Sequence, residues 1–340
     1  MKKVSLKDLA EILGVSKTLI SLVLNNKGDT HGISPETQKR VFELARKLNY
    51  KPNLLARGLR TGKSNIIGLI VADISNSFYS RIARSIEDKV RQHGFHLMVC
   101  SSDEDAERER ELFRVLKDEQ QVNGIIVSTT QDDFNFFNQL KKEGFPFVLI
   151  DRYIQKFQPA QVLVNNMEGS SHMVSFLLEK GYRKIGLLSI SPTHLSSIRD
   201  RIKGYKNALL AHGINPDPQL MREIPFNNIF DGVRKELKHL VSEKVKADAV
   251  FLLNNNLALA FLEAAKQENL KIPNDIAMVS FDDIEAFKIS DPPITSVSQP
   301  MEKIGELSVE RLMELIANPL RKTLPTDILP TEMVVRASTR

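Results

Sequence analysis

Residues 5–25 read SLKDLAEILGVSKTLISLVLN, and this stretch contains two short helical patterns separated by a glycine. Apolar residues recur at helical spacing after Ser5, which can cap the first helix with Asp8 as its capping partner. Gly14 breaks that helix, and Ser16 can cap a second one. Two short helices around a glycine turn are the helix-turn-helix pattern. A third helix starts behind a serine and a proline, so the expected helices cover residues 6–13, 17–25 and 35–48.

The second helix of such a motif can lie in the major groove of DNA, where its first residues reach base edges. Lys17 can donate to guanine, Thr18 can donate or accept, and Leu22 can contact a thymine methyl group. Three further polar side chains suit phosphate groups, namely Ser16, Ser21 and Asn25. A three-helix bundle without a nucleic-acid role has the same spacing, so the pattern by itself leaves both interpretations open.

Basic side chains are concentrated at the start of the chain. The first 63 of its 340 residues hold 13 Lys or Arg and 5 Asp or Glu, whereas the remainder is slightly acidic. A patterned basic segment of this kind indicates a polyanionic partner. The sequence has no apolar run of the roughly 18–20 residues that would cross a membrane, and no secretory leader. We therefore expect a cytoplasmic protein without a membrane partner.

A second stretch follows the three helices. Residues 50–62 read YKPNLLARGLRTG and lead directly into IIGLIV at 66–71. Together with Gly-Val-Ser at 14–16 and Val-Leu-Asn at 23–25, these segments resemble the lactose-repressor (LacI/GalR) family. The resemblance implies a sequence-specific transcription regulator, in which a hinge helix folds on double-stranded operator DNA and inserts Leu59 into the minor groove. The DNA-binding residues expected on this basis are Ser5, Leu6, Ser16, Lys17, Thr18, Ser21, Leu22, Asn25, Asn53, Ala56, Arg57 and Leu59.

Two departures from the family's pattern concern the choice of operator. The loop at residues 28–32 is longer than the family usually has, and Leu22 replaces an arginine that is common at its place. We therefore expect DNA binding but infer no operator sequence from the resemblance.

From residue 64 onward, apolar strand-like runs alternate with amphipathic helices in two successive series. This alternation predicts parallel sheets that are covered on both faces and arranged as two lobes. The expected strands are residues 66–71, 97–101, 124–128, 147–150, 184–189, 249–253 and 277–281. The expected helices are residues 78–93, 104–119, 133–143, 168–180, 197–212, 229–241 and 257–269. The predicted fold class is therefore an all-α helix-turn-helix headpiece plus a two-lobed α/β sensor domain with parallel sheets, similar to periplasmic binding proteins.

Polar and aromatic side chains gather where these strands end. Ligands on open α/β sheets bind beyond the carboxyl ends of the strands, which here face the space between the lobes. Carboxylates, amides and arginine can grip the vicinal hydroxyls of a sugar-like effector, and aromatic rings can stack on it, although any one of these residues can instead cap a helix. The candidate effector-binding residues are Asp73, Asn76, Phe78, Tyr79, Asp151, Arg152, Arg201, Asn255, Asn256 and Asp282.

The family resemblance ranks these candidates. It implies that Arg201, Asn255 and Asp282 are the principal effector contacts. Asn256 stands where an aspartate is usual, which removes a negative charge near the pocket and is compatible with an acidic effector.

The resemblance also sets the expected domain boundaries. The headpiece would cover residues 1–50, the hinge helix and linker residues 51–63, and the effector-binding domain residues 64–340. The family's chain crosses between its lobes three times, and we expect these crossings near Asn165, Ser296 and Thr326. The N-lobe would then hold residues 64–165 and 296–325, and the C-lobe residues 166–295 and 326–340.

A homodimer is the expected assembly, because members of this family associate side by side. Helices around residues 78–93 and 284–290 would supply the contact. A tetramer would need a C-terminal leucine heptad, which the last residues do not contain.

Two other classes of function share parts of this pattern. A sugar-modifying enzyme is disfavoured because the paired carboxylates are sequence neighbours and the seven histidines show no metal-ligand spacing, so no catalytic residue, metal or cofactor is expected. The stretch 58–64 resembles a phosphate-binding loop, but three residues separate its glycines where the signature needs four. A sugar-binding transport protein would not need the basic helix-turn-helix. We expect a repressor, while the sequence leaves open activation, the identity of the effector, and whether it acts as inducer or corepressor.

Overall fold

The computed structural model describes residues 4–50, 64–318 and 325–339. Its contacts divide the chain into two compact units, Met1–Ser64 and Asn65–Arg340. The expected hinge helix lies outside the described residues, and so do four candidate DNA contacts, Asn53, Ala56, Arg57 and Leu59.

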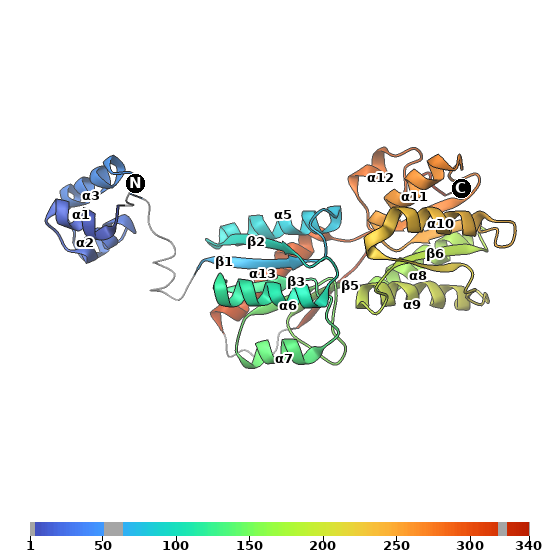
Figure 1. The fold of residues 1–340 in the computed structure, drawn as a ribbon, viewed down its shortest axis with the longest axis horizontal. Coiled ribbons are helices and arrows are strands. Elements are labelled where there is room, and N and C mark those ends of the chain that lie inside the picture. The colour runs from blue at the N-terminus through green and yellow to red at the C-terminus, as the bar shows by residue number, and fades with distance from the viewer. Residues whose placement is uncertain (1–3, 51–63, 319–324, 340) are drawn as a thin grey trace. The chain divides into compact units, whose positions relative to one another are not determined.

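The first unit contains three helices around a small apolar core (Figure 1). Their bounds are α1 Leu6–Leu13, α2 Lys17–Leu24 and α3 Pro35–Lys47, with a 3₁₀ turn at Asp29–His31. Ser5 and Asp8 form the predicted capping box, and Gly14 ends α1 with a φ of 67°, a left-handed conformation that favours glycine. The core consists of Leu9, Ala10, Ile20, Val23, Val41 and Ala45.

The loop between α2 and α3, which is longer than the family pattern, is a folded part of this unit. The Gln38 side-chain amide donates to Asp29 Oδ1 and to the Ile33 carbonyl, both at 2.8 Å. These bonds tie the 3₁₀ turn to the first turns of α3, so the extra residues do not loosen the bundle.

The second unit consists of two lobes, each built on a six-stranded sheet (Figure 1). The N-lobe sheet has the order β11-β5-β4-β3-β1-β2, and all its pairings are parallel. Its strands are β1 Ile66–Val71, β2 His96–Ser101, β3 Gly124–Val127, β4 Phe147–Ile150, β5 Gln161–Val164 and β11 Thr326–Leu329. Its helices are α5 Ser77–Gln92, α6 Ala106–Arg114, which continues as a π-helical turn over Val115–Glu119, α7 Phe134–Lys142 and α13 Met301–Ala317. Separate apolar cores lie on the two faces of this sheet.

The C-lobe sheet has the order β12-β10-β9-β8-β6-β7, with only the β10–β12 pair antiparallel among the described pairings. Its strands are β6 Ile185–Ile190, β7 Met221–Ile224, β8 Ala249–Leu252, β9 Ala277–Phe281, β10 Thr295–Ser298 and β12 Glu332–Val334. Its helices are α8 Asn166–Glu179, α9 Ser196–Ala211, α10 Ile229–Val241 behind a 3₁₀ turn at Phe226–Asn228, α11 Asn255–Gln267 and α12 Glu285–Ile289. One large core joins the helices to the sheet.

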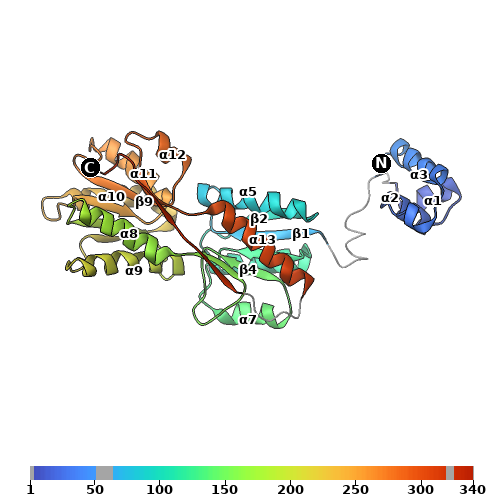
Figure 2. The same ribbon diagram turned by 180° about the vertical axis from the view of Figure 1, so that it is seen from behind.

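The chain crosses between the lobes three times, as Figure 2 shows for the last crossing, between β11 and β12. The first crossing follows β5, at the expected Asn165. The expected crossings near Ser296 and Thr326 are wrong by a few residues, because β10 continues in the C-lobe sheet to Ser298 and β11 belongs to the N-lobe sheet. Pro300 follows β10 and Pro330 follows β11. Because a proline cannot donate to a strand ladder, the strands end just before these residues, and the chain crosses between the lobes there.

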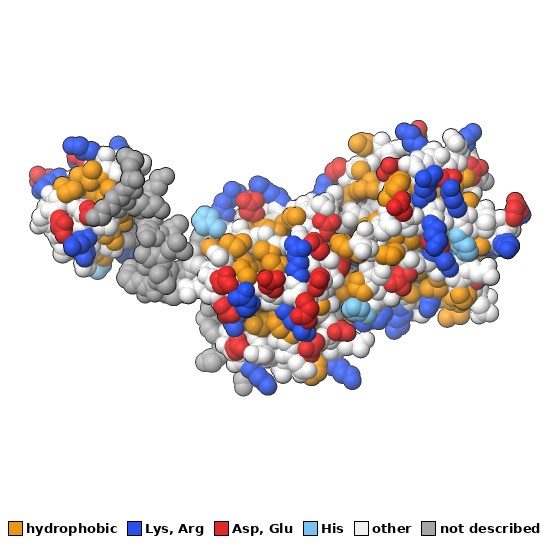
Figure 3. All heavy atoms as spheres, viewed as in Figure 1, with side chains coloured by type: hydrophobic (Ala, Val, Ile, Leu, Met, Phe, Trp, Pro, Cys, Tyr) orange, Lys and Arg blue, Asp and Glu red, His pale blue; other side chains and the backbone are white. Residues whose placement is uncertain are grey.

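On the face of the sensor unit that Figure 3 shows, charged side chains of both signs lie next to one another. Many form ion pairs between elements, such as Lys238 and Arg234 with Glu268 or Lys89 with Glu310. The surface of this unit is therefore mixed in charge, in agreement with the slightly acidic composition of residues 64–340.

Helices α8 and α9 pack closely because a glycine lies at their contact. Gly204 is buried on α9, and a Cβ atom there would collide with the Met167 carbonyl oxygen and meet Ser170 Cβ at 2.8 Å. The bond from Ser170 Oγ to the Arg201 carbonyl, 2.7 Å long, fixes the same contact. This packing holds α9, and with it Arg201, against the first helix of the C-lobe.

We predict that Gly204→Ala lowers the free energy of unfolding of the sensor unit by about 1–3 kcal/mol, because the added methyl group forces two backbones apart. Urea denaturation followed by circular dichroism measures the change, with Lys206→Ala on the exposed face of α9 as the control. In an uncrowded helix alanine is more stable than glycine, so an unchanged or raised stability of Gly204→Ala would contradict this packing.

Candidate functional site

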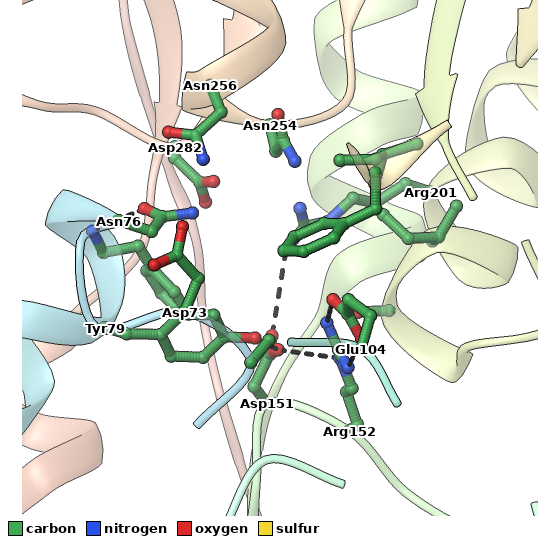
Figure 4. A pocket seen from close by; sticks show the side chains of 16 residues that line it. Asp73, Asn76, Tyr79, Glu104, Asp151, Arg152, Arg201, Asn254, Asn256 and Asp282 are labelled. Atoms are coloured by element: carbon green, nitrogen blue, oxygen red, sulfur yellow. Dashed lines mark hydrogen bonds and ion pairs between the residues drawn. The ribbon is translucent and has the colours of Figure 1, made fainter. Parts of the chain in front are cut away.

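The carboxyl ends of the strands in both lobes face a pocket between them (Figure 4). Nine of the ten predicted effector-binding residues line it, and the tenth, Asn255, lies behind the lining and bonds to three of them, Asn76, Asn256 and Asp282. The predicted set lacks Glu104 and the less polar members of the wall, and it lacks Asn254 although its strand-end position beside Asn255 and Asn256 pointed to it. The full lining is Ala72, Asp73, Asn76, Phe78, Tyr79, Glu104, Asp151, Arg152, Ile190, Ser197, Ile198, Arg201, Phe226, Asn254, Asn256 and Asp282.

Two of the pocket's amides also cap helices, as the alternative interpretation allowed. Asn76 Oδ1 accepts from the Phe78 amide at 2.9 Å, and Asn254 Oδ1 accepts from the Leu257 amide at 2.8 Å. Asn76 Oδ1 also accepts from Asn255 Nδ2 at 2.9 Å, which joins the N-terminal end of α5 in one lobe to that of α11 in the other. These amides therefore orient the pocket walls and hold the lobes together.

Asp151 follows β4 in a left-handed conformation, with a φ of 64°, and is 4% exposed. Its Oδ2 accepts from the Tyr79 hydroxyl at 3.0 Å and from Ser128 Oγ at 3.2 Å. Its Oδ1 has no hydrogen-bond partner, and Arg201 Nη2 lies 4.0 Å away. A buried carboxylate oxygen without a donor costs free energy, so this atom is prepared to accept from a ligand.

Arg152 and Glu104 form a buried two-pronged ion pair at the same end of the pocket. The guanidinium donates to both carboxylate oxygens, at 2.7 and 2.6 Å, and each side chain is 7% exposed. Burial alone would lower the pKa of Arg152, but the carboxylate of Glu104 holds that pKa well above its usual value. The turn that aims Glu104 inward places Asp103 and Glu104 at positive φ, 54° and 57°.

Arg201 enters the pocket from α9. Its Nε donates to Asn166 Oδ1 at 2.8 Å and its Nη1 to the Leu253 carbonyl at 2.7 Å. Its guanidinium carbon lies 3.8 Å from the centre of the Phe281 ring. Three partners therefore fix the group, and it presents Nη2 to the pocket.

Asp282 follows β9, also in a left-handed conformation, with a φ of 72°. Its Oδ1 accepts from Gln299 Nε2 at 2.5 Å, and its Oδ2 from the Asn255 amide at 3.4 Å. Burial raises the pKa of Asp282, Arg201 opposes that rise, and Asp151 from the other lobe adds to it. Because Gln299 lies where the chain crosses between the lobes, a pocket carboxylate is bonded to the crossing itself.

Further contacts join the lobes on the two sides of the pocket. The Tyr153 amide donates to Ser196 Oγ at 2.7 Å, and the Tyr153 hydroxyl donates to Asp200 Oδ2 at 3.0 Å. Arg81 on α5 pairs with Glu285 on α12 at 2.8 Å. The two lobes are therefore joined by bonds that a change in closure would break or re-form.

Behind the pocket, Glu109 anchors the loop that follows β3. It is completely buried and accepts from Thr129 Oγ1 at 2.6 Å, from the Thr130 amide at 2.6 Å and from Thr130 Oγ1 at 2.7 Å. Burial raises the pKa of Glu109, and the three donors oppose that rise. This loop begins at Ser128, which bonds to Tyr79 and Asp151 in the pocket.

Five of the candidate DNA-contacting residues within the described ranges lie at the N-terminal ends of α1 and α2, namely Ser5, Leu6, Ser16, Lys17 and Thr18, whereas Ser21 and Leu22 lie in the second half of α2 and Asn25 caps its C-terminal end. Lys17 and Thr18 are exposed at the start of α2, and Leu22 is half-exposed one turn later. Ser16 caps α2 by accepting from the Leu19 amide at 3.1 Å. Ser5 caps α1, Leu6 packs partly into the headpiece core, Ser21 is half-buried, and Asn25 Nδ2 donates to the Ser21 carbonyl at 2.6 Å. The capping hydroxyls leave the amides of each first helical turn oriented outward, which suits phosphate binding.

The described residues contain no group of three or more His, Cys, Asp or Glu that is placed to hold a metal ion. Within the same ranges, every helix is too short or too polar to cross a membrane.

Two family models match the chain. Residues 5–53 match the model described as bacterial regulatory proteins, lacI family, and residues 174–339 match the model described as periplasmic binding protein-like domain. The HTH-type transcriptional regulator RegA of Clostridium saccharobutylicum is 30% identical over 337 residues, which cover 98% of this chain and 99% of that protein.

Solved structures agree with this result. The lac repressor dimer bound to operator and the anti-inducer ONPF is 25% identical, with a TM-score of 0.85 and 99% of each chain covered. A LacI family transcriptional regulator from Enterococcus faecium with bound ribose is 28% identical, with a TM-score of 0.69 over 81% of this chain and 98% of that one. The predicted fold, a helix-turn-helix headpiece with a two-lobed α/β sensor domain, is confirmed.

We predict that Glu109→Ala lowers the free energy of unfolding by about 2–3 kcal/mol at pH 7, because three buried donors lose their acceptor. Glu107→Ala on the same helix, whose side chain is 83% exposed, is the control and should cost little. Because the pKa of Glu109 is raised in the folded state, its contribution to stability grows as the pH falls, so the difference between wild type and Glu109→Ala should widen from pH 7 to pH 5. Equal denaturation midpoints for the two variants would rule out the anchoring role.

Proposed function

The chain belongs to the lacI family of bacterial regulatory proteins and is a DNA-binding transcription regulator; from that premise we propose which ligands it takes and how they act on one another. The headpiece binds an operator in double-stranded DNA, and a sugar or sugar derivative binds between the lobes and changes the affinity for that operator. The expected outcome is repression. The observation that carries the proposal is the pocket, in which buried polar side chains from both lobes converge on one small volume.

The pocket's chemistry suits a polyhydroxy ligand. Carboxylates and amides can accept from hydroxyl groups, and Arg201 Nη2 can donate to them. The Phe78 and Tyr79 rings, 5.0 Å apart, are buried beside these groups and provide an apolar wall. The ribose bound to the Enterococcus faecium relative is consistent with a ligand of this class.

The coupling between ligand and DNA is conformational. A ligand that contacts both lobes stabilises whichever degree of closure suits it, and it can shift the equilibrium only by its difference in affinity for the two states. The chain crosses between the lobes three times, so a change in closure moves the N-lobe as a body. An inducer and a corepressor would both use this pocket and these crossings. Measuring whether the effector weakens or strengthens operator binding distinguishes the two.

In the headpiece, we assign base contacts to Lys17, Thr18 and Leu22 and phosphate contacts to the polar residues around them. The exposed N-terminal end of α2 supports this assignment. The basic balance of the first 63 residues supports a polyanionic partner. A regulator that acts on operator DNA in this way works in the cytoplasm and needs no catalytic residue, metal or cofactor.

A homodimer completes this proposal, since the related lac repressor is a dimer on its operator. Helices α5 and α12 lie along the same side of the sensor unit and are joined by the Arg81–Glu285 pair (Figure 1). Ile289 at the end of α12 is 86% exposed, and Val99 on the edge strand β2 is 38% exposed. Exposed apolar side chains on this side favour contact with a second copy.

The central test screens a sugar library by thermal shift on the full chain and then measures each hit's effect on DNA binding. The DNA in these measurements is a duplex that the wild-type protein selects from a pool of random sequences. We expect at least one sugar to raise the melting temperature and to change the affinity for the duplex by about fivefold or more. If no sugar alters DNA affinity, the sensing part of the proposal fails.

We predict that Lys17→Ala weakens binding to the selected duplex by about tenfold to a hundredfold and relaxes discrimination at one base pair. The control is Lys39→Ala, which removes the same charge from an exposed position on α3. Fluorescence anisotropy on the selected duplex and on its single-base variants measures both effects. Equal losses for the two variants, uniform over all duplexes, would contradict a base-reading role.

We predict that Ile289→Arg shifts the chain from dimer to monomer in sedimentation experiments, because the charge would be buried in the contact. Leu210→Arg is the matched control, since Leu210 is 55% exposed on α9, away from α5 and α12. A dimer that persists unchanged in Ile289→Arg would place the interface elsewhere.

A further inference from the structure

The charged side chains of the pocket limit the charge that its ligand can carry. This inference rests on the proposed function, in which a sugar-like effector binds in the pocket. Among the described residues that line the pocket, four carry carboxylates and two carry guanidinium groups. The carboxylates are those of Asp73, Glu104, Asp151 and Asp282, so the lining is negative overall even though Asn256 replaces the usual aspartate. A low-dielectric pocket with this balance repels an anion.

Both guanidinium groups already have partners. Arg152 is held by two bonds to Glu104, and Arg201 by Asn166 and the Leu253 carbonyl. A carboxylate or phosphate on the ligand would compete with Glu104 for Arg152 and would leave one of the two anions buried without a partner. Arg152 could in principle bind an anionic group of a ligand, but Glu104 already neutralises its charge.

The pocket also contains acceptors without donors. Asp151 Oδ1, in the lining, is buried and has no hydrogen-bond partner, and the same holds for Asn255 Oδ1 behind the lining. Arg152 Nε is a buried donor without a hydrogen-bond acceptor, but it lies 3.4 Å from Asp151 Oδ2 and is thus already beside an anion. A ligand hydroxyl or ammonium group can supply the missing donor, whereas a carboxylate or phosphate oxygen cannot. The unpaired acceptor therefore favours a ligand that donates hydrogen bonds, and the negative charge of the lining favours a ligand that is neutral or positively charged.

We propose that Glu104, by pairing with both terminal nitrogens of Arg152, sets the pocket's selectivity against acidic sugars, and that the effector is a neutral or amine-bearing sugar that donates to Asp151. Glu104 acts as a specificity-determining residue and Asp151 as a direct contact. This assignment replaces the expectation of an acidic effector that Asn256 alone suggested.

The test uses calorimetric titration of the full chain with matched sets built on glucose, galactose and mannose. Each set contains the parent hexose, its 2-amino derivative, its uronate and its 6-phosphate. Within any set that binds, we expect the amino or neutral member to bind at least about tenfold more tightly than the acidic members. An acidic member that binds tightest overturns the proposal.

The variant Glu104→Gln should raise the affinity for the acidic members relative to the parent hexose by about tenfold, because Arg152 loses its competing anion. Glu107→Gln is the control, since it removes the same charge from an exposed position three residues away, in the first turn of α6. Glu104→Asp keeps the charge and should keep the rejection of acids. Unchanged ratios in Glu104→Gln that melts like the wild type would remove Glu104 from this role.

The variant Asp151→Asn tests the same pocket from its other side and covers the case in which Glu104→Gln does not fold. It should lower the affinity for the amino member by about tenfold relative to the parent hexose, because the ammonium loses its anionic acceptor. Binding of amino sugars that is unchanged in Asp151→Asn contradicts the assigned contact. If no member of the three sets binds, the proposed ligand class is overturned, while DNA binding that responds to some other small molecule would leave the proposed regulatory function standing.

Discussion

Parallel strands bring all their carboxyl ends to one edge of a sheet, and this chain places two such edges opposite each other. Three of the pocket's carboxylates depend on that constraint, because Asp73, Asp151 and Asp282 each follow the end of a strand. The three crossings connect the two lobes beside these edges. The hydrogen bond between Asn76 and Asn255 joins α5 and α11, which begin at the two edges. Charges that would be costly in an ordinary core are thereby stabilised by partners from both lobes.

The strongly periodic segments of the fold could be predicted from the sequence. The capping box at Ser5 and the buried runs such as 66–71 and 249–252 carry unambiguous local signals. Strands β5, β7, β10, β11 and β12 were not predicted, because they lack the continuous apolar run that marks the equally short strands β3, β4 and β8. Strands β7, β11 and β12 are half-exposed at sheet edges, and β5 and β10 read QVLV and TSVS. Helix α13 was missed as well, although its buried residues Ile304, Ser308 and Leu312 recur at helical spacing, whereas its place in the N-lobe depends on the crossing after β10 and has no local signal.

The candidate site followed a similar rule. Residues that come directly after a recognisable strand, such as Asp151 and Asp282, were predicted, because their place in the sequence fixes their place at the sheet edge. Glu104 was assigned to the beginning of a helix, whereas the structure places it in a left-handed turn that aims it at Arg152. That pairing joins residues 48 positions apart and has no local signal. The local hint was that Glu104 comes three residues after the end of the predicted strand 97–101.

The burial of the pocket affects the rates at which a ligand binds and leaves, rather than its affinity. Asp151, Arg201 and Asp282 are each at most 4% exposed, and the walls that cover them belong to different lobes. A ligand therefore cannot reach its contacts by diffusion alone, and its association waits on an opening that breaks bonds such as Tyr153 to Ser196. Association should be slower than free encounter, and dissociation should be gated by the same motion. A switch built in this way keeps a bound signal for longer than its affinity alone would suggest, and so it averages over brief fluctuations in the supply of its effector.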